Sequence, residues 1–149
     1  MPIAAITLDL DDTLWPFAPI ASHIDQVLDR WLRTHSPATA ERFPIPAMQQ
    51  LRERTWQAHP ELAHDLSALR RITLEAAFQA SGAPLELVQP AYEAFYAARN
   101  TVTFYDDALD ALQRIAARFP IAALTNGNAD LAAIGIDHLF AFQLGAREH

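Results

Sequence analysis

The chain contains no cysteine and no lysine, and both absences limit what it can do. Without cysteine, disulfide bonds and thiol catalysis are excluded, and cysteine usage says nothing about the redox compartment. Without lysine, all 11 basic residues are arginines; they form no long run, and the formal net charge is -7. This charge pattern argues against nucleic acid or an anionic membrane surface as the main partner.

Long apolar runs are missing as well. No uninterrupted apolar stretch approaches about 18 residues, so no transmembrane helix is expected. The N-terminus has no positive segment and reaches its first acid at Asp9, which does not fit a signal peptide. We therefore expect a cytoplasmic protein. Its 149 residues, 51% of them hydrophobic, suffice for one domain, or for a core with a small inserted lobe.

The spacing of apolar residues changes character twice along the chain. Residues 3–8 form an apolar run typical of a strand buried on both faces. Residues 17–100 show helical spacing in about four stretches, with a connector at 39–46 and a helix end at Gly82. This region is predicted to be an all-helical lobe inserted after the first strand.

Strand patterns return after residue 100. Short strands are predicted at 101–105, 121–125 and 140–144, with a helix capped by Asp106 and a short helix over 129–134. Strands that alternate with helices predict an α/β fold, here an incomplete Rossmann-like parallel sheet of about three strands. The predicted division is a core of residues 1–16 and 101–149 with an inserted four-helix lobe of residues 17–100.

Two of the predicted strands end in unusual polar clusters. Asp9 and Asp11 follow the first strand, two residues apart, and would face the same side if the strand continued that far. One carboxylate can act as a nucleophile and the other as an acid and base, and such a pair also suits Mg²⁺. Thr125, Asn126 and Gly127 follow the later strand and offer a hydroxyl and backbone N–H groups to a phosphate.

Each cluster alone has an ordinary structural explanation. An aspartate triplet after a strand is often a solvated turn or a helix cap, and Thr-Asn-Gly is most often just a turn. The carboxyl ends of neighbouring parallel strands meet at one edge of a sheet, where ligands bind. Both clusters at that edge therefore favour an active site.

The stretch DLDDTL, residues 9–14, resembles the first motif of the haloacid dehalogenase-like hydrolase superfamily, and LTNGN, residues 124–128, resembles the second. A helical insert directly after the first motif is similar to the cap of subfamily I. The resemblance implies that Asp9 forms an aspartyl-phosphate, and that Asp11 protonates the leaving group and then activates water. It implies Mg²⁺ at the Asp9 carboxylate and the Asp11 backbone carbonyl. The phosphoryl group would be bound by Leu10, Thr125, Asn126 and Gly127.

The type of hydrolase and its substrate are also indicated by resemblance. Family dehalogenases lack an acid at the position of Asp11, because a halide needs no proton, so Asp11 favours phosphate esters. Thr13 is similar to phosphatases rather than to sugar phosphomutases. Residues 51–78 and 123–149 resemble the bacterial flavin-pathway phosphatases, which implies a small phosphorylated metabolite, either flavin mononucleotide or the phosphoribityl-pyrimidine precursor of riboflavin.

Three further residues are candidates for contact with the substrate. Asp65 and Arg70 match polar positions of the flavin-pathway phosphatases and would reach the substrate from the cap; a surface ion pair at helical spacing is the alternative. Trp15 follows the first motif directly, and we expect it to face the cleft. Trp31 and Trp56 lie on apolar stripes and are predicted to be core.

The family's third motif, a lysine or occasionally an arginine, and its fourth, an acidic pair, are not found. The sequence has no lysine, and Arg147 follows the second motif too closely. We therefore expect a C-terminally truncated chain with impaired activity, each lost electrostatic contribution costing roughly 10²-fold in rate. The alternative is a non-catalytic remnant that binds phosphate or a metabolite. The strand at 3–8 would be an exposed apolar edge, so self-association is expected.

Overall fold

The computed structural model describes residues 2–146, and contacts divide the chain into two compact units. One unit joins Met1–Ile20 to Asn100–His149, and the other is Ala21–Arg99. Each unit is described by itself. Arg147 lies outside the described residues. No helix within the described part of the chain is long and apolar enough to cross a membrane.

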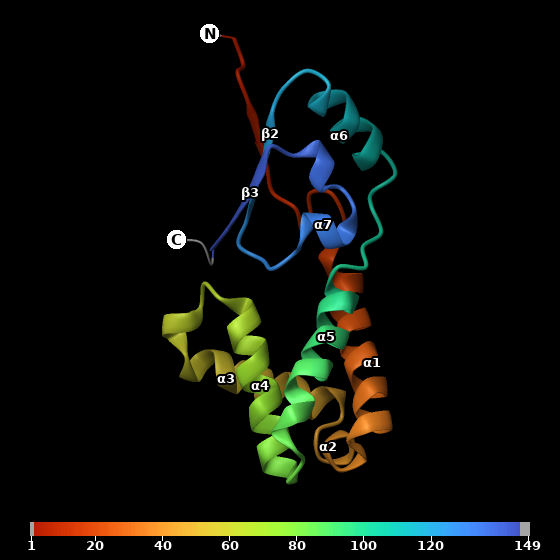
Figure 1. Cartoon of the computed structure of the whole chain (residues 1–149), viewed down its shortest axis with the longest axis vertical. Helices are drawn as coiled ribbons and strands as arrows, with labels where there is room; N and C mark the ends of the chain where they lie inside the picture. Colours follow the sequence, from red (N-terminus) through yellow and green to blue (C-terminus); the bar gives the residue numbers. More distant parts are fainter. Residues whose placement is uncertain (1, 147–149) are drawn as a thin grey trace. The chain divides into compact units, whose positions relative to one another are not determined.

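The first unit is built on a parallel sheet of three strands in the order β1-β2-β3. The strands are β1 (Ile6–Leu8), β2 (Ile121–Thr125) and β3 (Phe142–Gly145). Leu8 pairs with Ala123, and Thr125 pairs with Gly145, so the carboxyl ends of the strands lie at one edge. Helices α6 (Ala108–Ala116) and α7 (Leu131–Ile134) lie on the same side of the sheet (Figure 1). The predicted α/β fold with a three-stranded parallel sheet is confirmed.

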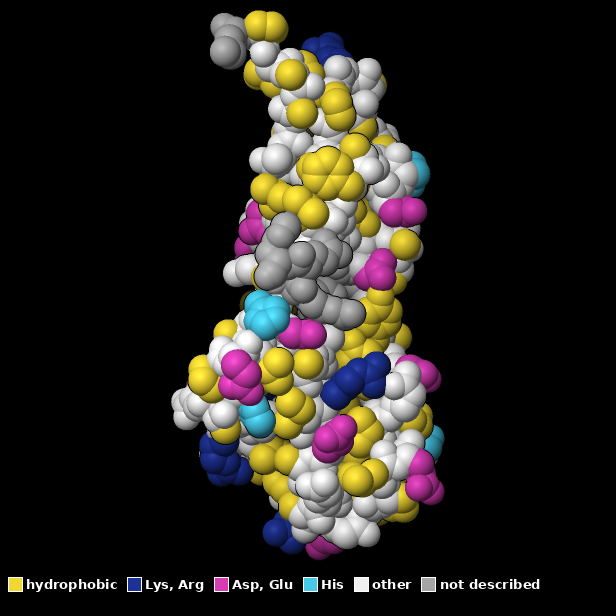
Figure 2. Space-filling view, turned by 60° about the vertical axis from the view of Figure 1, so that its left-hand side comes forward, with side chains coloured by type: hydrophobic (Ala, Val, Ile, Leu, Met, Phe, Trp, Pro, Cys, Tyr) yellow, Lys and Arg dark blue, Asp and Glu magenta, His cyan; other side chains and the backbone are white. Residues whose placement is uncertain are grey.

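The other side of the sheet carries exposed apolar side chains. Leu124 of β2 and Phe142 of β3 are 43% and 54% exposed, whereas Ile121 and Ala123, which alternate with Leu124, are buried. Hydrophobic side chains gather over the sheet on this side (Figure 2). Apolar side chains therefore lie on both faces of the sheet, although only one face is covered by helices. We call the uncovered side the open face, and it is a candidate contact surface.

Strand β1 is shorter than predicted, because only Ile6–Leu8 pairs with a neighbour. Ile6 pairs with Ile121 and donates its N–H to the carbonyl oxygen of Pro120 at 3.0 Å. Proline has no N–H to return, so the ladder ends at this point. Residues 2–5 are exposed, with Ile3 at 66%.

The prediction of a strand at residues 101–105 is wrong. These residues form no strand; the segment instead lies against the first motif, where the Tyr105 N–H donates to the carbonyl oxygen of Leu14 at 3.0 Å. High β-propensity does not make a strand without a free partner edge. The N-cap of α6 is Asp107 rather than the predicted Asp106, and its side chain makes no capping hydrogen bond.

The second unit is helical and has its own core. Its helices are α1 (Phe17–His35, which begins in the first unit), α2 (Pro37–Arg42), α3 (Ile45–Ala58), α4 (Leu66–Ser81) and α5 (Val88–Arg99). Gly82 ends α4 in the left-handed conformation, with φ of 70°, as predicted. The buried cluster that joins the helices consists of Leu28, Leu32, Ala40, Met48, Leu74, Ala77, Phe78, Val88 and Ala91.

Two of the helices have a proline in their first turn. Helix α1 begins at Phe17 with Pro19 in its first turn, and α2 has Pro37 in its first turn. Proline fits the first turn of a helix, where its missing N–H would have no partner. The connector predicted at 39–46 is therefore in part a helix that begins at a proline.

Candidate active site

Strand β1 delivers Asp9 to the carboxyl edge of the sheet. The Asp9 side chain is exposed, and its Oδ1 accepts a hydrogen bond from the Leu10 N–H at 2.8 Å. Leu10 itself is fully buried, so its side chain anchors the chain where it leaves the strand. The Leu10 N–H, which was predicted to hold a phosphate, is thus occupied by the Asp9 carboxylate.

Asp11 lies in a tight turn that follows the strand. Because β1 ends at Leu8, strand alternation does not extend to Asp11, and only Asp9 of the pair lines the cavity at this edge. The Thr13 and Leu14 N–H groups donate to the Leu10 carbonyl oxygen at 3.1 and 2.9 Å. Strand alternation, the condition under which both carboxylates were expected to face the same side, therefore does not apply to this pair.

Trp15 is buried rather than turned toward a cleft. Its side chain is 0% exposed, its ring meets Phe104 edge-on at 5.5 Å between centroids, and its indole N–H donates to Asp11 Oδ1 at 2.8 Å. The expectation that Trp15 faces the cleft is wrong, because its side chain is fully buried.

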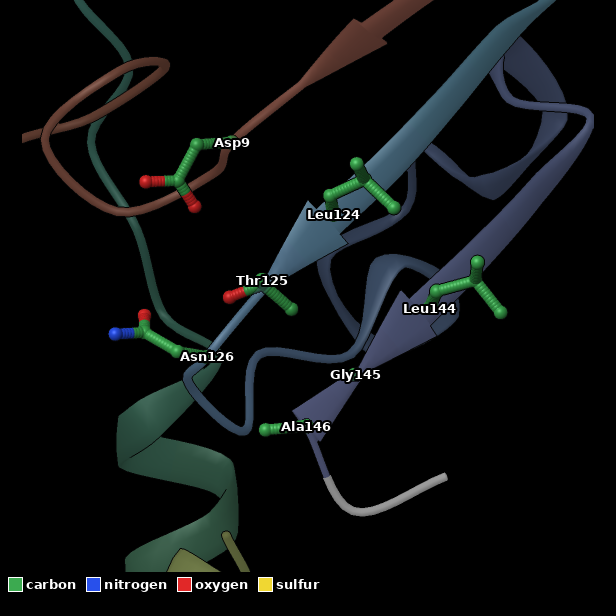
Figure 3. A pocket seen from close by; sticks show the side chains of 7 residues that line it. All are labelled: Asp9, Leu124, Thr125, Asn126, Leu144, Gly145 and Ala146. Atoms are coloured by element: carbon green, nitrogen blue, oxygen red, sulfur yellow. The ribbon is translucent and has the colours of Figure 1, made fainter. Parts of the chain in front are cut away.

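Strand β2 delivers Thr125 and Asn126 to the same edge. Thr125 is buried, and its Oγ1 accepts the Gly127 N–H at 3.0 Å, while Asn126 is exposed. Figure 3 shows the Asp9 carboxylate and the Thr125 hydroxyl projecting to the same side of the strand ends. The structure therefore brings together three of the predicted residues, and the Gly127 N–H is already used within its turn.

A cavity of about 400 Å³ lies at this edge of the sheet. Sequence reasoning did not identify the part of its lining that comes from the open face and from the end of β3. The alignment of parallel strand ends is the signal that could have found Gly145 and Ala146, since β3 was predicted. The lining residues are Asp9, Leu124, Thr125, Asn126, Leu144, Gly145 and Ala146 (Figure 3).

The loop after β2 is held by two amide side chains that the sequence did not single out. Gln143 Nε2 donates to the Ala129 carbonyl oxygen at 2.7 Å, and Asn100 Oδ1 accepts the Asp130 N–H at 2.9 Å. Asp130 then caps α7 by accepting the Ala132 N–H at 2.9 Å. These contacts fix the loop that carries Asn126.

Asp65 and Arg70 belong to the helical unit. Asp65 is the N-cap of α4 and accepts the Ala68 N–H at 2.9 Å. Arg70 is 6% exposed, and its guanidinium carbon lies 4.5 Å from the centre of the Phe95 ring. Burial, reinforced by the nearby charge of Arg52, lowers the pKa of Arg70 to about 10. Arg70 is therefore not a surface residue, and its contact with a substrate stays a prediction.

The side chain of Asp9 at the end of β1 offers carboxylate oxygens, the type of ligand that a hard cation prefers. Across residues 2–146, no group of three or more histidine, aspartate or glutamate side chains could hold a metal ion. Mg²⁺ sites commonly use one or two carboxylates together with substrate phosphate and water. The exposed Asp9 carboxylate beside the cavity fits this donor set.

Comparison with known proteins identifies the family to which this site belongs. A family model described as haloacid dehalogenase-like hydrolase matches residues 3–149. The chain belongs to the haloacid dehalogenase-like hydrolases. The resemblance drawn from the motifs at 9–14 and 124–128 is thus confirmed, and the chain belongs to a family of hydrolytic enzymes.

Two known proteins match almost the whole of this chain at 30% and 32% identity over the aligned residues. The 5-amino-6-(5-phospho-D-ribitylamino)uracil phosphatase YigB of Escherichia coli (strain K12) is 30% identical over 151 residues, covering 99% of this chain and 63% of YigB. The crystal structure of 2-haloacid dehalogenase from Pseudomonas syringae pv. Tomato DC3000 is 32% identical, with a TM-score of 0.88, covering 99% and 65% of the two chains. The chain therefore spans less than two thirds of each relative's length.

A more distant structure supports the fold alone. The putative HAD-hydrolase YfnB from Bacillus subtilis, bound to magnesium, is 17% identical with a TM-score of 0.58. The match covers 94% of this chain and 63% of YfnB.

Proposed function

We propose that the chain carries the phosphoryl-transfer site of a phosphatase that hydrolyses a small phosphorylated metabolite. The observation that carries the proposal is the cavity at the strand ends, where the Asp9 carboxylate lies beside Thr125 and Asn126. Asp11 follows two residues later as the acid that an ester leaving group needs. The phosphatase activity named for YigB supports the same reaction class.

The proposed reaction has two steps. A carboxylate oxygen of Asp9 attacks phosphorus, the bond to the ester oxygen breaks, and Asp11 transfers its proton to that oxygen. The Asp11 carboxylate then takes a proton from a water molecule while the water oxygen attacks phosphorus in the aspartyl-phosphate. The bond between Asp9 and phosphorus breaks, which releases phosphate and restores the Asp9 carboxylate. The Asp9 carboxylate and the Asp11 backbone carbonyl would hold Mg²⁺, which would supply positive charge to offset the repulsion between Asp9 and the phosphate.

The name of YigB also supports a proposal for the substrate. Flavin mononucleotide and the phosphoribityl-pyrimidine precursor of riboflavin are the substrates that we propose, because YigB is named for a substrate of this kind. We propose residues 17–100 as the cap, with Asp65 and Arg70 directed to the non-phosphate part of the substrate.

A dehalogenase is the second candidate, because the structure with a TM-score of 0.88 is a 2-haloacid dehalogenase. A halide leaves without a proton, so Asp11 has no acid role in that reaction. We expect the chain with Mg²⁺ to release phosphate from p-nitrophenyl phosphate and to release no chloride from 2-chloropropionate. Phosphate assay and ion chromatography check this, and chloride release without phosphate release would replace the proposed function by the second.

We expect the rate to be low. The sequence has no lysine to neutralise the charge of Asp9 and a phosphate dianion together. One missing electrostatic contribution of this kind lowers the rate roughly 10²-fold. A chain that binds phosphate without turnover would be the non-catalytic binding module that is the alternative to an enzyme.

We propose that the chain self-associates through the free edge of β1 and the open face beside it. Residues 2–8 include no charged side chain to block pairing, and Ile3, Leu124 and Phe142 are exposed. Sedimentation equilibrium should show a mass above that of one chain, and Ile3→Lys should shift the chain toward monomer. A wild-type chain that remains monomeric over a concentration range of about 1 to 100 μM contradicts the proposal.

A further inference from the structure

The buried indole of Trp15 makes a contact that packing alone does not require. A fully buried tryptophan usually finds an acceptor for its N–H, and a backbone carbonyl would serve. Here the acceptor is a carboxylate, Asp11 Oδ1, at 2.8 Å. Trp56 shows that a buried indole nitrogen need not recruit a carboxylate: the residue is partly buried, and its buried Nε1 has no hydrogen-bond partner in the described part of the chain.

The turn that joins the two residues is held by its own backbone. The Asp12 N–H donates to the Trp15 carbonyl oxygen at 2.7 Å, and Asp12 adopts a φ of 59°. Residues other than glycine rarely adopt positive φ, although aspartate tolerates it better than most. Asp12 Oδ1 also accepts the Phe17 N–H at 2.8 Å, at the start of α1. The positive φ of Asp12 is therefore held by hydrogen bonds of both its backbone N–H and its side chain.

The indole cannot follow the carboxylate if Asp11 rotates. Its ring is 0% exposed and contacts Phe104, and the next segment is attached through the hydrogen bond from Tyr105 to Leu14. Rotation of the Asp11 carboxylate would break the bond at Oδ1 and leave a buried N–H without a partner, which is costly. The contact therefore fixes the direction in which the other carboxylate oxygen lies.

We propose that Trp15 is a positioning residue for the acid of the reaction: its indole N–H fixes the orientation of the Asp11 carboxylate, which passes its proton to the leaving-group oxygen. This inference rests on the proposed phosphatase function. Proton transfer to a leaving group is sensitive to small misplacement of the acid. An alkoxide leaving group needs that proton, whereas p-nitrophenolate leaves readily without it, so the contribution of Trp15 depends on the leaving group.

The first test measures the contact without turnover. Each of the three tryptophans gives one indole N–H signal in a ¹H–¹⁵N spectrum, and the signal lost in Trp15→Phe belongs to Trp15. We expect Asp11→Ala to move this signal upfield and to leave the Trp31 and Trp56 signals in place. Asp12→Asn, which keeps an oxygen acceptor at the neighbouring position, should leave all three unchanged. A Trp15 signal that does not respond to Asp11→Ala overturns the inference.

The second test measures the consequence for catalysis. In Trp15→Phe, which keeps an aromatic ring but loses the N–H, kcat/KM for an alkyl phosphate such as glycerol 2-phosphate should fall about 10- to 100-fold further than for p-nitrophenyl phosphate. A merely structural role lowers both rates equally, and that result overturns the positioning role alone. Absence of turnover by the wild-type chain overturns the proposed function together with the role, and the indole signal then still reports whether the contact exists.

Discussion

Replacing Asp9 with asparagine is expected to abolish the release of phosphate from p-nitrophenyl phosphate. Asparagine keeps the shape of the side chain and an oxygen that can accept the Leu10 N–H, but its amide is a poor nucleophile toward phosphorus. Loss of the nucleophile costs on the order of 10⁴-fold or more in rate. Because uncatalysed hydrolysis of phosphate monoesters is among the slowest reactions known, even a weakly active wild-type chain stands far above the background.

The same substitution three positions along provides the control. Asp12→Asn keeps an Oδ1 acceptor for the Phe17 N–H, and asparagine also tolerates a positive φ. This variant should retain most of the wild-type rate in a steady-state assay with Mg²⁺. Equal rates for wild type and Asp9→Asn would show that the phosphate release does not come from this site.

Replacing Phe78 with alanine is expected to lower the free energy of unfolding of the helical unit by about 3 to 5 kcal/mol. Phe78 is 0% exposed and lies in the buried cluster that joins the helices α1 to α5 and also includes Leu74 and Ala77. The alanine leaves a cavity that rigid helix–helix packing cannot close. Urea denaturation followed by circular dichroism at 222 nm measures the change.

Phe142→Ala is the matched control, because it makes the same deletion at a half-exposed position of β3. It should cost less than about 1 kcal/mol, as most surface substitutions do. If both variants lose the same amount of stability, the helical unit is not held together by the cluster around Phe78.

The parts of the fold that were predicted correctly from the sequence are those marked by a local signal at the end of a strand or helix. Carboxylates after an apolar run, as at Asp9, mark the end of a strand at a ligand-binding edge, and a hydroxyl followed by Asn-Gly marks another. Gly82 was identifiable as a helix end because positive φ favours glycine. These local signals, placed in the order of the family's motifs, were enough to predict the family and the edge of the sheet that carries the cavity.

The wrong predictions concern residues whose meaning depends on distant partners. Residues 39–46 were predicted to be a connector, yet α2 occupies part of this segment and contributes Ala40 to the common core. Residues 101–105 have β-forming side chains, yet they lie against the first motif rather than in the sheet. The contact between Trp15 and Asp11 depends on a positive φ at Asp12, and spacing alone gives no sign of that conformation.

The Asp9 carboxylate and the Thr125 hydroxyl each accept a hydrogen bond from a nearby backbone N–H group. The Leu10 N–H is bound by Asp9 Oδ1, and the Gly127 N–H is bound by Thr125 Oγ1. An arriving ligand therefore gains hydrogen bonds from these groups only by exchange, and the net gain is the difference in acceptor strength. Charged oxygens are the stronger acceptors. At Gly127 the resting acceptor is a neutral hydroxyl, so we expect an anion to gain from the exchange there, whereas at Leu10 the resting acceptor is already a carboxylate and the exchange brings little.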